Sequence, residues 1–288
     1  MNPALKPFFC YYGGKWRATP KYPPPLFRTI VEPFAGAAGY STRYPDRRVI
    51  LIEKDPIVAA LWRWLISVSA SEVRRIPLLA PGQTVDDLHV CEEAKSLVGF
   101  WLNKGSAQPK KRPSSRFLAL TRPDSHWGEV IRERIATQVE QIRHWRVIEA
   151  SYSETAPAIR ATWHVDPPYQ LRGIHYRCSA KAIDFAHLAR WCQALRGQVM
   201  VCEQEGADWL PFEFLGTFRA NNSKNGKGHT AEVLWQNSSS TEGSRIGLAI
   251  AAKARAEIDL LRDALIEAPG NQAVHGTRAE RAAEECPF

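Results

Sequence analysis

The sequence predicts an α/β fold in which helices cover a parallel sheet and an additional segment interrupts the chain. Short apolar stretches typical of buried strands alternate with segments whose apolar residues recur at helical spacing. The chain has 288 residues, enough for one large domain with an insertion, and 44% of them are hydrophobic, which indicates a packed core. A basic stretch rich in Gly, Ser and Pro then breaks the alternation.

Residues 29–68 carry the first strands and helix. The stretch "TIVEPFAGAAGYS" indicates a short strand that ends in a glycine-containing turn, and "RRVILIEKDP" contains a buried strand from Val49 to Ile52. In "IVAALWRWLISV" the apolar residues fall at the spacing of one helix face. A strand–turn–strand–helix order of this kind predicts neighbouring parallel strands.

Residues 69–128 are predicted to form an inserted subdomain. They contain a predicted helix at 91–103 and the irregular basic stretch "NKGSAQPKKRPSSR". A predicted helix at 128–144 leads back to the core. The later core elements are predicted in "WRVIEASY", "ATWHVDPPY" and "GQVMVCEQEG", in a helix at 184–196, and in strands near 213–219 and 230–236. Residues 238–288 are predicted to form a linker, one amphipathic helix and a disordered tail.

Charge and cysteine content narrow the functional class. The net charge of +8 and the pI of about 9.3 suit a polyanionic partner such as nucleic acid. The cysteines form no C-x-x-C pair and no cluster with zinc spacing, so we expect no metal site. Because no apolar leader or long apolar run is found, we expect a cytoplasmic protein without a membrane segment. We also expect a monomer.

Three distinctive stretches each follow a predicted strand. They are "EPFAGAAG" at 32–39, "EKDP" at 53–56 and "DPPY" at 166–169. Ligands of open parallel sheets bind beyond the carboxyl ends of the strands, so these stretches are predicted to meet at one edge. Glu53, at the end of the second strand, is placed to accept hydrogen bonds from two ribose hydroxyls, and Asp55 is a second candidate for that role.

The "DPPY" stretch is stiff and presents hydrogen-bond acceptors only. Each proline fixes φ near −65° and has no N–H, and the residue before a proline is held extended. Asp166 therefore offers its carboxylate beside backbone carbonyls, which suits a donor-rich group such as an amine. Tyr169 adds a flat face for stacking. A plain proline-rich turn is the alternative interpretation of this stretch.

The motifs taken together resemble those of DNA adenine-N6 methyltransferases of the Dam type. The resemblance rests on "YYGGK" at 11–15, "VEPFAGAAGYS" at 31–41, "ILIEKDP" at 50–56 and "VDPPY" at 165–169, whose order and spacing match. It covers roughly residues 8–236. It implies a Rossmann-like SAM-dependent methyltransferase sheet in a catalytic domain of residues 1–68 and 129–237, with an inserted, mainly helical target-recognition region at 69–128.

The resemblance also implies roles for individual residues. The family transfers a methyl group from S-adenosyl-L-methionine to N6 of adenine in DNA. Tyr11 and Lys15 would line the cofactor pocket, the turn after the first strand would pass beneath the methionine part, and Glu53 would bind the ribose. Ser151 and Tyr152 replace an Asp-Phe pair that touches the cofactor's adenine in many relatives. The implied cofactor-binding residues are Tyr11, Lys15, Glu32, Phe34, Ala35, Gly36, Glu53, Ser151 and Tyr152, and the implied catalytic residues are Asp166, Pro167, Pro168 and Tyr169.

In the implied mechanism, the Asp166 carboxylate and the Pro167 carbonyl accept hydrogen bonds from the target amine of an extruded base that stacks on Tyr169. The predicted DNA contacts are Lys110, Lys111 and Arg112 in the insertion and Asn222, Ser223, Lys224 and Lys227 in the loop "ANNSKNGKGH". A solvated basic loop is the alternative for the first group. Three other functions stay open: methylation of cytosine N4, methylation of an RNA base, and a catalytically inactive DNA-binding relative.

Overall fold

The computed structural model describes residues 3–103, 105–113, 126–155, 158–171, 173, 176–219 and 229–237. The predicted linker, C-terminal helix and tail at 238–288 therefore lie outside the described residues. Among the helices that are described, none is long and apolar enough to cross a membrane.

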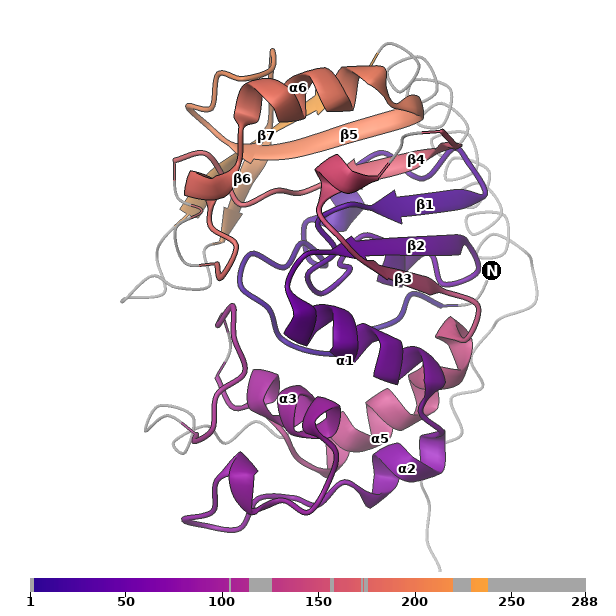
Figure 1. The fold of residues 1–288 in the computed structure, drawn as a ribbon, viewed down its shortest axis with the longest axis vertical. Helices are drawn as coiled ribbons and strands as arrows, with labels where there is room; N and C mark the ends of the chain where they lie inside the picture. The colour runs from indigo at the N-terminus through magenta and orange to yellow at the C-terminus, as the bar shows by residue number, and fades with distance from the viewer. Residues whose placement is uncertain are drawn as a thin grey trace, which may run out of the picture. The chain divides into compact units, whose positions relative to one another are not determined.

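A seven-stranded sheet with the order β3-β2-β1-β4-β5-β7-β6 forms the core of the fold (Figure 1). Strands β1 to β5 pair in parallel, and β7 runs antiparallel to both β5 and β6. This mixed, mostly parallel sheet confirms the predicted α/β class. The strands are β1 (Thr29–Glu32), β2 (Arg48–Glu53), β3 (Arg146–Glu149), β4 (Arg160–Val165), β5 (Arg196–Gln204), β6 (Glu213–Arg219) and β7 (His229–Gln236).

The helices follow the apolar periodicity of the sequence. They are α1 (Pro56–Ser67), α2 (Ala70–Arg75), α3 (Glu92–Trp101), α5 (Glu129–Gln138) and α6 (Phe185–Ala194). The helix predicted at 128–144 is shorter than expected, because its α-helical part ends at Gln138 and continues as the 3-10 helix η5 (Val139–Ile142).

Helix α2 was not predicted, although its start carries a recognisable signal. Ser69 and Glu72 form a capping box, in which each side chain accepts a hydrogen bond from the backbone amide of the other. Within 69–128, the described residues hold α2, the 3-10 helix η3 (Val85–Asp87) and α3, and no strand.

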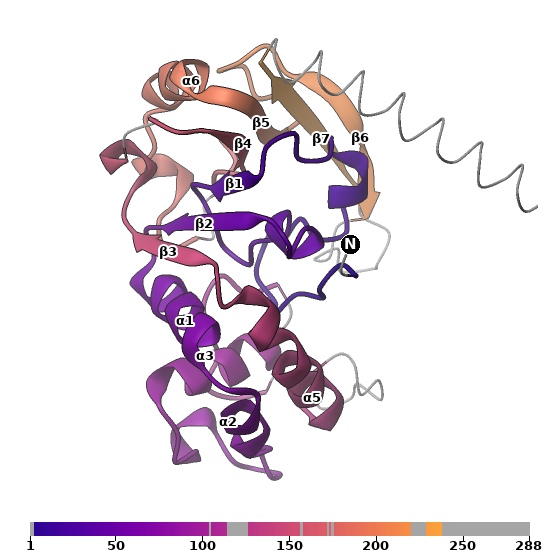
Figure 2. The ribbon, with the colours of Figure 1, turned by 90° about the vertical axis from the view of Figure 1, so that its right-hand side faces the viewer.

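Side chains of the strands alternate between two apolar clusters, one on each face of the sheet. Ile30 belongs to the cluster that includes side chains of α1, α3 and α5, whereas its neighbour Val31 belongs to the cluster that includes side chains of α6. In both views α6 lies beside β4 and β5, while α1 lies close to β2 and β3 with α2, α3 and α5 beyond it (Figures 1 and 2). The carboxyl ends of the parallel strands are left open at one edge.

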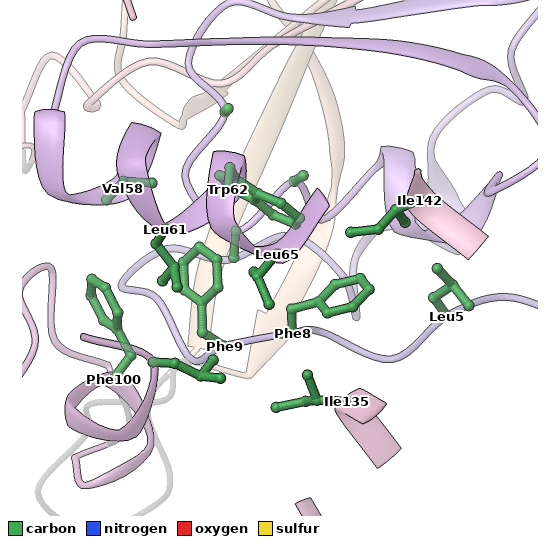
Figure 3. Close-up of a cluster of buried hydrophobic side chains, with 14 of the residues drawn as sticks. Leu5, Phe8, Phe9, Val58, Leu61, Trp62, Leu65, Phe100, Ile135 and Ile142 are labelled. Atoms are coloured by element: carbon green, nitrogen blue, oxygen red, sulfur yellow. The ribbon is translucent and has the colours of Figure 1, made fainter. Parts of the chain in front are cut away.

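The N-terminal segment runs between α1 and the helices of the 69–144 region (Figure 3). The ring of Phe8 lies 5.7 Å from that of Trp62 in α1, and Phe9 lies 5.1 Å from Phe100 in α3. Trp101 Nε1 donates a hydrogen bond of 2.8 Å to the Phe8 carbonyl. This aromatic packing fixes the chain immediately before Tyr11, and therefore fixes the position of the "YYGGK" stretch.

Candidate functional site

A cleft with about 930 Å³ of free space, part of it open to solvent, lies beyond the carboxyl ends of β1, β2 and β4. Segments far apart in the sequence form its walls. All residues predicted to bind the cofactor line it, as do two residues of the "DPPY" stretch. These lining residues are Tyr11, Lys15, Glu32, Phe34, Ala35, Gly36, Glu53, Ser151, Tyr152, Asp166 and Pro168. Pro167 and Tyr169 do not line it.

The turn after β1 is fixed around Gly36. This residue has φ of +45°, a region that favours glycine, and an added Cβ would lie 3.0 Å from a ring carbon of Tyr11. Its N–H donates to Glu53 Oε2 at 2.8 Å, and its carbonyl accepts from Trp62 Nε1 at 2.7 Å. The backbone at Gly36 can therefore meet a ligand closely without a side chain intervening.

Glu53 ends β2 and is only 8% exposed. Besides the Gly36 amide, it accepts a hydrogen bond of 2.9 Å from the Asp55 amide. Burial raises the pKa of Glu53 to about 7, against the opposite effect of these backbone hydrogen bonds. Asp55, the second candidate, caps α1 by accepting from the Ile57 amide, although it also lines the cleft. Glu53 is therefore the better placed carboxylate for a ligand.

The aromatic wall of the cleft comes from two strand ends. The rings of Phe34 and Tyr152 lie 5.3 Å apart with 34° between their planes. Tyr152 Oη lies 3.1 Å from His187 Nδ1 in α6, and Ser151 caps the 3-10 helix η6 (Tyr152–Glu154). Together these contacts hold two aromatic side chains beyond the ends of β1 and β3, where both line the cleft.

Glu32 is buried beside a histidine that sequence inspection did not single out. Its carboxylate accepts from the Ser41 amide at 2.7 Å and lies 3.5 Å from His164 Nδ1, while His164 Nε2 lies 3.4 Å from Cys202 Sγ. Burial lowers the pKa of His164, but the Cys202 sulfur and the Glu32 carboxylate raise it by more, to about 10. A protonated His164 offsets the Glu32 charge inside the sheet.

At the inner end of the cleft, Lys15 pairs with Asp166. Lys15 Nζ lies 2.9 Å from Oδ1 and 3.0 Å from Oδ2 of Asp166, and 3.0 Å from the Gly13 carbonyl. It also lies 4.6 Å from the ring centroid of Tyr169. Lys15 thus contacts the side chains of both Asp166 and Tyr169, which its prediction as a cofactor-pocket residue did not include.

The turn that follows "DPPY" is fixed by a buried carboxylate. Glu203, at 0% exposure near the end of β5, accepts hydrogen bonds from the Gln170 amide at 2.7 Å and from Trp209 Nε1 at 3.2 Å. The Gly173 amide donates to the Tyr169 carbonyl at 2.7 Å. Glu203 was not predicted, because nothing in "VCEQEG" separates it from an ordinary strand-end charge.

One wall of the cleft was missed altogether. It comes from the segment between Tyr176 and Ile183, and Tyr176 Oη donates to the Tyr12 carbonyl at 3.2 Å. This segment has no strand or helix pattern before its 3-10 turn, so its path across the cleft could not be predicted. The residues from it that line the cleft are Tyr176, Cys178, Ser179, Ala182 and Ile183.

The residues of the insertion that are predicted to contact DNA do not line the cleft. Lys111 Nζ pairs with Asp86 at 2.7 Å on the surface, and the Lys110 amide donates to the Gly99 carbonyl of α3. The backbone of this basic stretch is therefore tied to α3 and η3. Asn222, Ser223, Lys224 and Lys227 lie outside the described residues.

Within the described part of the chain, no group of three or more His, Cys, Asp or Glu side chains could hold a metal ion. The sequence matches none of the known protein-family models, and comparison with curated proteins finds no similar sequence.

Proposed function

We propose that the protein transfers a methyl group from S-adenosyl-L-methionine to the N6 amino group of adenine in DNA. The observation that carries this proposal is the cleft itself, in which the cofactor-type motifs and Asp166 line one space although they are spread over the chain. The strand order β3-β2-β1-β4-β5-β7-β6, with β7 antiparallel, also supports it, because this order is consistent with SAM-dependent methyltransferases.

The donors and acceptors of the cleft fit this cofactor. Glu53 accepts hydrogen bonds and can bind a vicinal diol, and the backbone at Gly36 allows close approach. Phe34 and Tyr152 present aromatic faces, which suit both a purine ring and the charge of a sulfonium. When bound, the cofactor supplies a methyl group on a sulfonium that is already a good leaving group.

The role proposed for Asp166 is orientation of the attacking amine. The carboxylate and the Pro167 carbonyl accept the two N–H groups of the amine, which draws the nitrogen lone pair out of the purine ring system. The lone pair then points along the line of attack, and the rate gain comes from this alignment and from fixed charge. The amine proton is lost to water after the nitrogen has gained the methyl group.

The role proposed for Tyr169 is to stack on the extruded base. A paired adenine cannot reach a site this deep, so the base must leave the duplex. The turn that carries Tyr169 is held by the Glu203–Gln170 and Gly173–Tyr169 hydrogen bonds. A fixed stacking face lowers the entropic cost of holding the base so that its amine reaches the Asp166 carboxylate and the Pro167 carbonyl.

Expression in a host without DNA methylation tests the proposal. Hydrolysis of host DNA to nucleosides should give N6-methyladenine with the natural protein and none with Asp166→Ala. N4-methylcytosine in its place would support methylation of cytosine N4. A methylated base in the host RNA would support methylation of an RNA base. Absence of any methylated base, from a protein that binds S-adenosyl-L-methionine by calorimetry, would overturn the proposal and favour an inactive DNA-binding relative.

A further inference from the structure

The Lys15–Asp166 pair presents a donor and an acceptor side by side. Lys15 is 6% exposed and Asp166 is 19% exposed, so the carboxylate is the more accessible partner. The ammonium makes three contacts of 2.9 to 3.0 Å, two to Asp166 and one to the Gly13 carbonyl. Two of its three protons are used in hydrogen bonds, to Asp166 Oδ2 and to the Gly13 carbonyl, and together the contacts place the ammonium beside Asp166 in a defined position.

Lys15 stays protonated in this environment. Burial lowers its pKa, but Asp166 together with Tyr169, Glu232 and Tyr176 raises it by more, and the net pKa lies well above the ordinary value. A protonated amine donates hydrogen bonds and accepts none. The ammonium also lies 4.6 Å from the ring centroid of Tyr169. A flat ligand that stacks on Tyr169 and reaches Asp166 therefore meets Lys15 at the same edge.

We propose that Lys15 is a specificity-determining residue that donates a hydrogen bond to the substrate ring nitrogen next to the target amino group. This inference rests on the proposed function. Asp166 accepts from the amine and Lys15 donates to its neighbour, so the pair recognises an amidine edge. Since only two of the three ammonium protons are used in hydrogen bonds, the third is available for the bond to the base.

This edge divides the nucleobases by chemistry. Adenine and cytosine carry an amino group beside an unprotonated ring nitrogen, which accepts a hydrogen bond. Guanine carries its amino group between a ring N–H and N3, an acceptor on the sugar edge of the base, and uracil and thymine have no amino group. A ring N–H facing the Lys15 ammonium would set donor against donor in a buried site, which costs the full desolvation of both groups.

Single-atom changes in the base test the inference. Duplexes carry adenine, 1-deazaadenine or 7-deazaadenine at the methylated position, and kcat/KM is measured for the natural protein and for Lys15→Met. The natural protein should lose roughly 10- to 100-fold on 1-deazaadenine, the value of a hydrogen bond to a charged group. It should keep most of its activity on 7-deazaadenine, which retains the ring nitrogen that Lys15 contacts. 1-Deazaadenine pairs poorly and leaves the duplex more easily. Its weaker pairing would raise kcat/KM, so it cannot cause the expected loss.

Lys15→Met should be slower on adenine and should show no further loss on 1-deazaadenine. Equal rates of the natural protein on both bases would overturn the inference, and so would a second full loss in Lys15→Met. The first of these outcomes is measured with the natural protein alone. It therefore tests the inference even if Lys15→Met folds poorly. If the duplex with ordinary adenine is not methylated at all, that result contradicts the proposed function itself, and the inference that rests on it is then also wrong.

Discussion

Three carboxylates of the cleft lie within one strand-end region but have different neighbours. Glu53 is held by backbone amides, Glu32 lies beside His164, and Asp166 is paired with Lys15. A carboxylate that faces only amides keeps acceptor capacity for a ligand, whereas one that faces a cation is fixed in position. These differences support the roles proposed above, diol binding for Glu53 and amine orientation for Asp166.

The Glu53 environment predicts that cofactor affinity depends on pH. In the free protein its pKa is raised to about 7, so lowering the pH through this value protonates it. A diol donates to the ionised carboxylate, which means that binding favours the ionised form and lowers the pKa in the complex. Affinity should therefore fall as the pH drops below about 7, by up to about tenfold per pH unit. Titration calorimetry in buffers of different ionisation enthalpy should detect proton release on binding.

Glu53→Gln is the control for this prediction. The amide keeps the shape of the side chain and cannot ionise. Binding to the variant should be weaker near pH 8 and nearly independent of pH between about 6 and 8. An unchanged pH profile in Glu53→Gln would contradict the role assigned to Glu53.

From the residues alone, a position in the cleft was predictable only where a motif marks a strand end. Glu53 and Asp166 could be predicted because each directly follows an apolar strand and begins a polar turn. His164 and Glu203 could not, since each lies inside or at the end of a strand and its partner is remote in sequence. The Lys15–Asp166 contact, which joins residues 151 positions apart, depends on the folded sheet.

At the scale of elements, β5 supports the "DPPY" turn through Glu203. Glu203→Gln keeps one acceptor oxygen but places a side-chain amide NH2 group, a donor, opposite the Gln204 N–H, which donates to Oε2 at 2.8 Å. We expect a stability loss of about 1–3 kcal/mol and a lower kcat with little change in the KM for cofactor. Urea denaturation and steady-state kinetics measure the two effects. Glu205→Gln, an exposed change in the same loop, is the matched control and should have neither effect.

The contact between the "YYGGK" turn and the Tyr176 segment gives a second element-scale prediction. Gly13 has φ of +71°, and an added Cβ would lie 2.3 Å from Tyr176 Oη. Gly13→Ala should displace Tyr176 from the cleft wall and weaken cofactor binding. Gly82→Ala is a matched control, because Gly82 has φ of +85° and no atom within 4 Å of an added Cβ.

Both glycine variants should lose about 1–2 kcal/mol of folding free energy from backbone strain alone. Only Gly13→Ala should also lose cofactor affinity, as measured by calorimetry. Equal cofactor affinity in the two variants would contradict a role for Tyr176 in the cleft wall.

Elements with strong periodicity were predictable, and irregular ones were not. The apolar spacing in "IVAALWRWLISV" predicted α1, and Asp55 with Pro56 supplies its cap and first residue. Helix α2 spans only Ala70–Arg75, too short for a periodic signal, and only the Ser69–Glu72 capping box marks it. The segment from Tyr176 to Ile183 has no periodicity, so its place in the cleft wall depends on tertiary contacts.

At the scale of the whole molecule, the sheet order explains why distant motifs meet. β1 lies at the centre between β2 and β4, so the turns after these strands share one edge. The sequence predicted that edge from strand alternation alone. It did not predict the order of the strands, because pairing between strands is not encoded in local periodicity.

The positive charge of the molecule predicts salt-dependent DNA binding. The net charge is +8, and the basic stretch of the insertion contributes Lys110, Lys111 and Arg112. Changing all three to alanine should lower the slope of log affinity against log salt by about 0.9 for each phosphate that the variant no longer neutralises. Since Lys111 is already paired with Asp86, its share should be the smallest. Fluorescence anisotropy at several salt concentrations measures the slope.

A variant in which the same number of cations is removed elsewhere is the control. Arg63, Arg74 and Lys95 lie on helices, and each pairs with a glutamate. Their combined change to alanine should leave the slope closer to that of the natural protein. Equal slopes for both triple variants would indicate that overall charge, and not the basic stretch with Lys110, Lys111 and Arg112, determines binding.

Transfer of a labelled methyl group tests the central claim most directly. The purified protein is incubated with duplex DNA and S-adenosyl-L-methionine labelled in the methyl group, and the DNA is digested to nucleosides. The label should appear in N6-methyladenine, and Asp166→Ala should reduce the rate roughly 100- to 1,000-fold or more while it still binds cofactor. A natural protein that binds cofactor and DNA but leaves adenine unlabelled, or an Asp166→Ala variant that keeps the full rate, would contradict the account.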